Sequence, residues 1–226
     1  MIKFFRKIRQ KLLSENKFSK YLIYAVGEII LVVIGILIAL QINTWNDSRK
    51  QNILEDDFIN GIKNDLKQDK EYILMILNIN KEKDSIYEII NSDLFDLYDN
   101  NRSKLDSLLN QFIANSRTFY PAVGTFESAI SGNDLGKFKN KFFSTATTKL
   151  YNSTYTRLND NAKSFDDRFY YLVKKYSFER RTGHIREMNN NQLTELLDDL
   201  FYYSKAMKYY DNLLNDALAE INILIK

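Results

Sequence analysis

The hydrophobic pattern changes along the chain from one continuous apolar run to a helical repeat. Residues 21–42 contain only two strongly polar side chains, Glu28 and Gln41. As a helix rising about 1.5 Å per residue, this run spans roughly 33 Å, close to the thickness of a hydrocarbon core. A core helix of a soluble domain would show a polar face, and a cleaved signal peptide would be shorter and end at a small-residue cleavage site. We therefore expect an uncleaved transmembrane signal-anchor helix at 21–45.

After residue 46, apolar residues recur at three- and four-residue steps with charged and amide residues between them, as in amphipathic helices. The single proline and seven glycines also favour long helices over turn-rich β structure. We expect an all-α fold, with one N-terminal transmembrane helix followed by an extracytoplasmic antiparallel helical bundle at 46–226. The expected helices are at about 47–92, 103–116, 135–178 and 191–225. The first of them either continues the transmembrane helix or begins separately after it.

Residues 117–138 carry the strongest turn signal, because they hold the only proline and three of the seven glycines. We expect Thr125 to cap a short helical turn and Ser103 to cap the helix at 103–116. Ser131 and Gly132 should then form a sharp reversal, with Gly132 at positive φ.

The formal net charge of +3 is unevenly distributed, because basic residues gather in the first 20 positions and the region after residue 47 is near neutral. The positive-inside rule then predicts a cytoplasmic N-terminus and an extracytoplasmic C-terminal region. Tyr21 and Tyr24 should lie at the inner interface and Trp45 at the outer one. A near-neutral domain argues against a nucleic-acid partner.

Within the basic tail at 1–20, residues 14–20 predict a turn before the membrane helix, and residues 1–13 predict a short basic amphipathic helix, with Phe5, Ile8 and Leu12 on one stripe. Such a helix would lie on the anionic inner leaflet and bind membrane lipid. A charge cluster that only sets the topology is the alternative. The basic residues available for lipid binding are Lys3, Arg6, Lys7, Arg9 and Lys11.

Glu28 is an ionisable residue inside the expected span, where such residues are costly. At 100° per residue, Gly35, Ala39 and Asn46 lie within about 20° of Glu28 around the helix. Gly35 and Ala39 form a small-xxx-small pair, which allows close helix approach. This stripe predicts packing in a homo-oligomer or against another membrane protein. A lone glutamate that reaches toward the interface is the alternative.

The sequence shows no recognisable catalytic or cofactor chemistry. We find no nucleophile motif, phosphate-binding glycine loop or dinucleotide fingerprint, and there is no cysteine. The only histidine, His184, has no partner at metal-ligand spacing. Adjacent carboxylates such as Asp198 and Asp199 point about 100° apart on a helix, and we expect solvated faces. No catalytic residue, metal or cofactor is therefore expected. The sequence also holds aromatic doublets at 169–171 (Phe-Tyr-Tyr), 201–203 (Phe-Tyr-Tyr) and 209–210 (Tyr-Tyr). They should be core and rim, and they are where a ligand pocket would be sought.

The segment FFRKIRQKLLSENKFSKYLIYAVGEIILVVIGILIALQINTWND resembles the N-terminal signature of an uncharacterised single-pass membrane protein family of Bacteroidota, a domain of unknown function. TFESAISGNDLGKFKNKFFSTATTKLYN is similar to that family's second recurring segment. The resemblance implies an inner-membrane location and carries over no activity. The residues on its motif positions are Glu28, Gly35, Gln41, Trp45, Ser131 and Gly132.

These observations lead us to expect a non-enzymatic assembly or interaction component of an envelope complex. The alternative is a membrane-anchored sensory or ligand-binding bundle that signals to a partner. An enzyme would be a third class, and no motif supports it.

Overall fold

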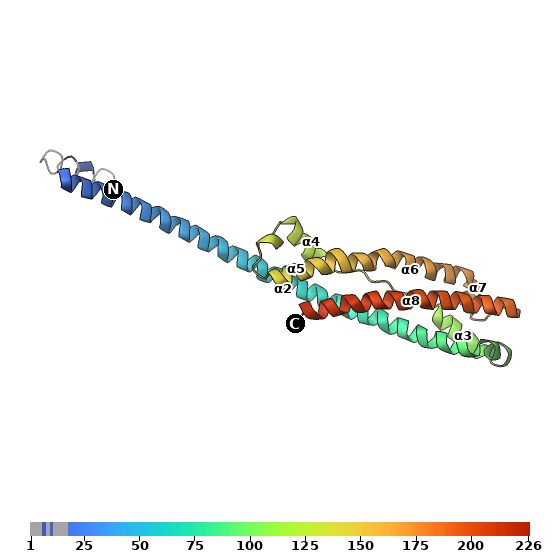
Figure 1. The fold of residues 1–226 in the computed structure, drawn as a ribbon. Coiled ribbons are helices and arrows are strands. Elements are labelled where there is room, and N and C mark those ends of the chain that lie inside the picture. Colours follow the sequence, from blue (N-terminus) through green and yellow to red (C-terminus); the bar gives the residue numbers. More distant parts are fainter. Residues whose placement is uncertain (1–5, 8–9, 11–17) are drawn as a thin grey trace. The chain divides into compact units, whose positions relative to one another are not determined.

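The computed structural model describes residues 6–7, 10 and 18–226, with the side chains of 18, 20 and 21 excepted (Figure 1). Within these residues every regular element is a helix, as the sequence predicts. The chain divides into two compact units, Met1–Leu54 and Glu55–Lys226. We refer to the second unit as the helical domain.

The first long element, α2, runs from Phe18 to Asn100 and contains both the expected span and the amphipathic helix after it. From residue 22 to 54 its side chains are exposed or half-buried, including the aliphatic ones. It is the one helix in the described part of the chain that is long and apolar enough to cross a membrane. In the helical domain the same helix has a regularly buried face, and its backbone departs from helical angles at Asp93 (φ −129°, ψ 16°).

The remaining elements belong to the helical domain. The helix expected at 135–178 begins only at Lys141, because Phe138 is extended (φ −65°, ψ 143°) and packs its ring 5.0 Å from that of Phe58. The elements are α3 (Arg102–Phe112), α4 (Gly124–Ser131), the 3₁₀ turn η1 (Leu135–Lys137), α5 (Lys141–Lys149), the π-helical segment η2 (Leu150–Tyr155), α6 (Thr156–Lys175), α7 (Ser177–Thr182) and α8 (Asn190–Leu224).

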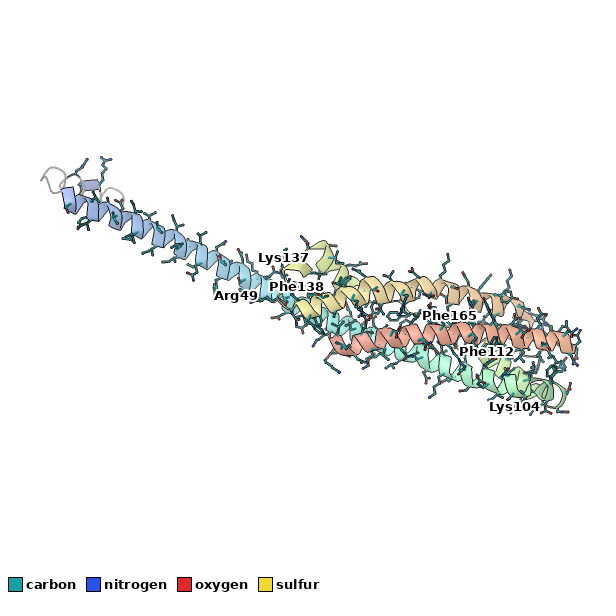
Figure 2. The ribbon with its side chains drawn as sticks, in the orientation of Figure 1. Arg49, Lys104, Phe112, Lys137, Phe138 and Phe165 are labelled. Carbon is teal, nitrogen blue, oxygen red and sulfur yellow. The ribbon has the colours of Figure 1, made fainter. Side chains whose placement is uncertain are left out.

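One hydrophobic core joins α2, α6 and α8, which run side by side in Figure 1. Its centre is a stack of aromatic rings, in which Phe165 of α6 lies between Tyr203 (5.3 Å) and Tyr210 (5.0 Å) of α8. Figure 2 labels Phe165 on α6 and Phe112 at the end of α3, and both belong to this core. The α2 face of the core follows the predicted three- and four-residue steps and includes Phe58, Ile62, Leu66, Ile73, Ile76, Tyr87, Ile90 and Leu94.

Two expected helix caps are wrong. Asn101, two residues before Ser103, caps α3, and its side chain accepts a hydrogen bond from the Lys104 amide (3.3 Å). Thr125 lies inside α4, whose N-terminus has no side-chain cap. A methyl group added at Gly61 would lie 2.7 Å from Cγ2 of Thr125, so Thr125 packs closely against α2 and is not available as a cap.

The reversal at Ser131 and Gly132 is present, but the expected backbone angle is wrong. Ser131 ends α4, and Gly132 is right-handed (φ −76°), whereas the positive φ belongs to Asn133 (53°). Asparagine tolerates this conformation because its short polar side chain can bond locally. Gly132 serves another purpose, because a Cβ there would collide with the side chain of Asp134.

Candidate functional site

The residues of the predicted packing stripe all lie on α2 in the first unit. Glu28, Gly35, Ala39 and Asn46 are helical, as the projection around the helix requires. Glu28 is half-buried and the other three are exposed. A Cβ built on Gly35 has no described atom within 4 Å, so this surface is open to a neighbouring helix. The packing itself stays a prediction.

The expected interface anchors lie on the same helix. Tyr24 and Trp45 are 51% and 66% exposed, as side chains at a membrane surface would be in the isolated chain. The side chain of Tyr21 lies outside the described residues. In the tail, Arg6 and Lys7 are helical and exposed. The other expected lipid-binding residues, Lys3, Arg9 and Lys11, lie outside the described residues.

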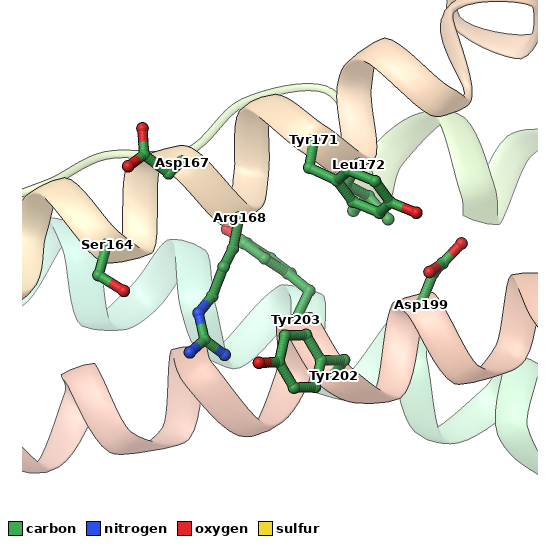
Figure 3. Close-up of a pocket in the computed structure, with 8 residues that line it drawn as sticks. All are labelled: Ser164, Asp167, Arg168, Tyr171, Leu172, Asp199, Tyr202 and Tyr203. Carbon is green, nitrogen blue, oxygen red and sulfur yellow. The ribbon is translucent and has the colours of Figure 1, made fainter.

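A groove runs between α6 and α8 on the surface of the helical domain. Its first part is a hollow of about 470 Å³, shown in Figure 3. The second part, of about 250 Å³, shares Ser164 and Arg168 with the first. We call the two parts together the α6–α8 groove. The other lining residues are Asp167, Tyr171, Leu172, Asp199, Tyr202 and Tyr203 in the first part, and Asn161, Phe165, Lys205, Ala206, Tyr209 and Tyr210 in the second.

Helical periodicity brings these side chains to the groove. Ser164, Arg168 and Tyr171 recur at four- and three-residue steps on α6, and Tyr202 and Tyr209 are one heptad apart on α8. Such residues form one stripe on each helix. The two stripes meet because the buried residues beside them, among them Phe165 and Tyr203, hold α6 and α8 together.

Arg168 is the central cation of the groove. Its guanidinium carbon lies 4.5 Å from the ring centre of Tyr202, and Figure 3 shows the side chain reaching from α6 toward α8. Arg168 is half-buried and makes no hydrogen bond or ion pair within the described part of the chain. Asp199 differs, because it pairs with Lys175 (2.7 Å) and accepts a hydrogen bond from the Tyr176 hydroxyl (2.7 Å).

The aromatic doublets divide between core and rim, as the sequence predicts. Tyr203 and Tyr210 are buried, whereas their neighbours Tyr202 and Tyr209 are 60% and 55% exposed. The expectation of solvated aspartate pairs is wrong for Asp199, whose side chain is only 17% exposed. Each helix turns 100° per residue, so one member of such a pair can face the neighbouring helix while the other faces water.

A buried lysine in the domain is not anticipated by any motif. Lys83 is 2% exposed, and its ammonium lies 4.5 Å from the ring centre of Phe169 and 5.2 Å from that of Tyr203. Among the described residues its Nζ has no hydrogen-bond partner. Burial, and then the charge of Arg180, lowers the pKa of Lys83 to about 7. The sequence does hold a signal for this residue, because it falls on the buried stripe of α2 between Ile76 and Ile90.

A buried carboxylate connects three parts of the domain. Asp69 is 3% exposed and accepts hydrogen bonds from the Tyr155 hydroxyl (2.7 Å) and the Ala122 amide (2.9 Å). Burial raises the pKa of Asp69 to about 6, against the lowering effect of these hydrogen bonds. Burial and the charge of Asp69 also raise the pKa of Tyr155 far above its ordinary value. Since Tyr155 ends the π-helical segment, Asp69 links α2 to that segment and to the 117–123 loop.

The arginine-rich loop around His184 is held by internal bonds. The His184 ring lies 2.9 Å from a carboxylate oxygen of Asp106, and the described residues contain no cluster of three metal-binding side chains. Arg186 donates hydrogen bonds of 2.6 and 2.8 Å to buried Glu179. Burial would raise the pKa of Glu179, but these bonds outweigh it, and the pKa is lowered. The guanidinium of Arg186 is therefore already paired.

Comparison with known proteins identifies a family. The model of a Family of unknown function (DUF6090) matches residues 28–178, about two thirds of the chain. The chain belongs to this family, which confirms the expectation of a domain of unknown function. No curated protein and no solved structure matches the chain.

Proposed function

We propose that this member of the DUF6090 family is a non-enzymatic inner-membrane protein that serves in the assembly or interactions of an envelope complex. In this proposal α2 anchors the chain, and the helical domain is a bundle in the periplasm of a bacterium with two membranes, as the resemblance to Bacteroidota proteins implies. The main support is the first unit, where aliphatic side chains such as Ile29, Leu31 and Val32 are all at least 57% exposed. A helix with apolar side chains all around it is stable in lipid and unfavourable in water.

The proposed interaction runs through the stripe of Glu28, Gly35, Ala39 and Asn46. Without a hydrophobic driving force between helices in lipid, close backbone packing and polar bonds decide which helices associate. The open space at Gly35 allows close backbone packing, and the side chain of Glu28 can supply a polar bond between helices. The chain either pairs with a second copy or joins another membrane protein.

The domain's buried carboxylates also favour a non-enzymatic role. Asp69 and Glu179 are both held by hydrogen bonds that join separate segments. A general acid or base must be able to reach a substrate, and both of these side chains lie inside the domain.

Membrane topology can be tested with single cysteines, because the chain has none of its own. Ser14→Cys marks the tail and Asp56→Cys the start of the helical domain. With the outer membrane permeabilised, a membrane-impermeant maleimide should label only Asp56→Cys, and disruption of the inner membrane should expose Ser14→Cys. Labelling of Ser14→Cys in intact inner membranes would reject the proposed orientation.

Helix packing can be tested by crosslinking and co-purification of the full chain from membranes. Gly35→Leu and Glu28→Ala should each remove most of the crosslinked oligomer or the co-purified membrane partner. Gly27→Leu is a matched control, since it adds the same bulk on the neighbouring face, 100° from Glu28. Equal effects of Gly27→Leu and Gly35→Leu, or none from either, would contradict the stripe.

A second candidate function is a ligand-binding or sensory bundle that signals through α2 to a partner. The α6–α8 groove is the observation that favours it, because its volume is in the range of small-molecule sites. The two candidates are distinguished by what copurifies with the full chain. An envelope complex supports the assembly role, and a bound small molecule with a signalling partner supports the sensor.

A further inference from the structure

We propose that the α6–α8 groove binds a small organic oxyanion, a carboxylate or phosphate attached to a planar apolar body. Arg168 and Lys205 hold the charged group, and tyrosine rings of α8 contact the body. This site goes beyond the proposed assembly role, since it needs no partner in the membrane. It supplies a ligand class for the second candidate function.

The state of Arg168 is the first support. A half-buried guanidinium loses part of its hydration, and within the described residues Arg168 gains no carboxylate or carbonyl in exchange. The guanidinium carbon lies 4.5 Å from the ring centre of Tyr202, and within the described residues the N–H groups of Arg168 have no hydrogen-bond acceptor. A planar fork of N–H donors matches a carboxylate or phosphate with two parallel hydrogen bonds.

The distribution of charge around Arg168 is the second support. Lys205 lines the other part of the groove, where no carboxylate is among the lining residues. In the first part Asp199 pairs with Lys175, which also contacts Glu195, and Figure 3 shows Asp167 directed to the side of α6 opposite Arg168 although it lines the hollow. The positive charge therefore lies in the second part, which Arg168 and Lys205 line without a carboxylate. Ser164, shared by both parts, adds a hydroxyl that can bond to an oxyanion.

The apolar lining makes an organic anion a better fit than a bare inorganic one. Tyr171 and Tyr202 line the first part and Tyr209 the second, and these rings are 54%, 60% and 55% exposed. A planar body beside such side chains gains from burial of apolar area and from ring contacts.

The arginine-rich loop is another cationic cluster, and its contacts show why the groove is the better site. Arg186 is paired with Glu179, and Arg180 donates a hydrogen bond to the carbonyl of Ala114 (3.2 Å). These arginines have protein partners. Arg168, in contrast, lies beside the ring of Tyr202 and lines an open hollow.

The test is a titration of the full chain, in nanodiscs of zwitterionic lipid, with phenyl phosphate and with benzoate. At least one should bind, and Arg168→Gln should weaken its binding at least tenfold. Adding Lys205→Gln should abolish measurable binding. Lys174→Gln is the matched control, because it removes an exposed cation from α6 outside the groove and should leave affinity unchanged. Circular dichroism checks that each variant is folded.

Two further probes test the composite site. Inorganic phosphate lacks the apolar body and phenol lacks the charge, so both should bind at least tenfold more weakly than the organic anion. The proposal is overturned if neither organic anion binds, if inorganic phosphate binds equally well, or if Lys174→Gln and Arg168→Gln weaken binding equally. Gly35→Leu should retain anion binding, so failure of the membrane stripe and failure of the groove are separate results.

Discussion

The ammonium of Lys83 lies 4.5 Å from the ring centre of Phe169, inside the helical domain, and no group in the described part of the chain forms a hydrogen bond with it. Attraction between a cation and aromatic rings is worth about 0.5–2 kcal/mol and offsets only part of the cost of removing the charge from water. The part of this desolvation cost that is not offset lowers the pKa of Lys83. This residue therefore reduces the stability of the folded domain at neutral and acidic pH.

We predict that Lys83→Met stabilises the protein. An apolar side chain of similar length fills the same space without a desolvated charge, and such replacements gain about 1–3 kcal/mol. Thermal unfolding of the full chain in detergent at pH 6, followed by circular dichroism, measures the change. Lys81→Met, at an exposed position two residues earlier, should leave the unfolding temperature nearly unchanged. If Lys83→Met unfolded at a lower temperature than the wild type, the attraction between the cation and the rings would exceed the cost of burying the charge.

The advantage of Lys83→Met should shrink as the pH rises. The folded protein releases the Lys83 proton near pH 7 and the unfolded chain only near 10.5. Between these values the unfolded state binds more protons, so the free energy of unfolding of the wild type rises by at most about 1.4 kcal/mol per pH unit. Comparing the two proteins at pH 7 and pH 9 checks this, and a constant difference would contradict a lowered pKa.

Asp69 should have the opposite effect in the acidic range, where it should make the free energy of unfolding fall as the pH rises. Its pKa is raised from 3.8 to about 6, so between these values the folded state binds the extra proton. Its contribution to stability is full below about pH 4 and is lost as the pH rises through 6. Asp69→Asn should flatten this decline by up to about 1.4 kcal/mol per pH unit. Denaturant titrations at pH 4.5 and 6.5 measure it, with Asp57→Asn, an exposed aspartate of α2, as the control.

Glu55 should stabilise the start of α5. Its buried carboxylate accepts hydrogen bonds from the backbone amides of Lys139 (2.9 Å) and Asn140 (2.6 Å). Glu55→Ala leaves both amides without this acceptor and should cost about 2–3 kcal/mol. Hydrogen exchange should then accelerate at these two amides, whereas Asp56→Ala, at an exposed position, should leave them protected. Unchanged protection in Glu55→Ala would show that water replaces the carboxylate at little cost.

Gly61 should be required by the approach of α4 to α2. A Cβ at this position would lie 2.7 Å from Cγ2 of Thr125, which is too close for two carbon atoms. Gly61→Ala should therefore cost about 1–2 kcal/mol, although alanine is the better helix former. Thr125→Ser removes the clashing methyl group, so Gly61→Ala should cost less in that background. A double-mutant cycle of thermal unfolding measures the coupling, and additive effects would rule out the contact.

The period of apolar residues was sufficient to predict that the helical domain is built from long helices. It anticipates the buried face of α2 and the extent of α8, which begins at Asn190 and ends at Leu224. It does not give the breaks in the helix expected at 135–178, because these depend on partners far away in sequence. Phe138 packs on Phe58, and Glu55 binds the amides before α5.

The candidate site was only partly predictable. The aromatic doublets on α6 and α8 indicate where a pocket should be sought, because alternate members of each doublet must face the core. Which side chains surround Arg168 depends on the rotation of α6 against α8, and the sequence does not give this. Asp199 shows the same limit, since its expected exposure is contradicted by its contacts with Lys175 and Tyr176.

The sequence by itself determined the helical class and the long apolar helix, because periodicity and composition are local properties of the chain. The family follows from the match of the chain to a family model over residues 28–178. Tertiary structure alone decided which polar residues are paired. Lys83 is buried among aromatic rings, Asp69 accepts a hydrogen bond from Tyr155, and Arg168 has no ion pair among the described residues. All three features arise where helices distant in sequence meet. The cost of desolvating a charge depends on those neighbours, and no pattern within a single helix specifies them.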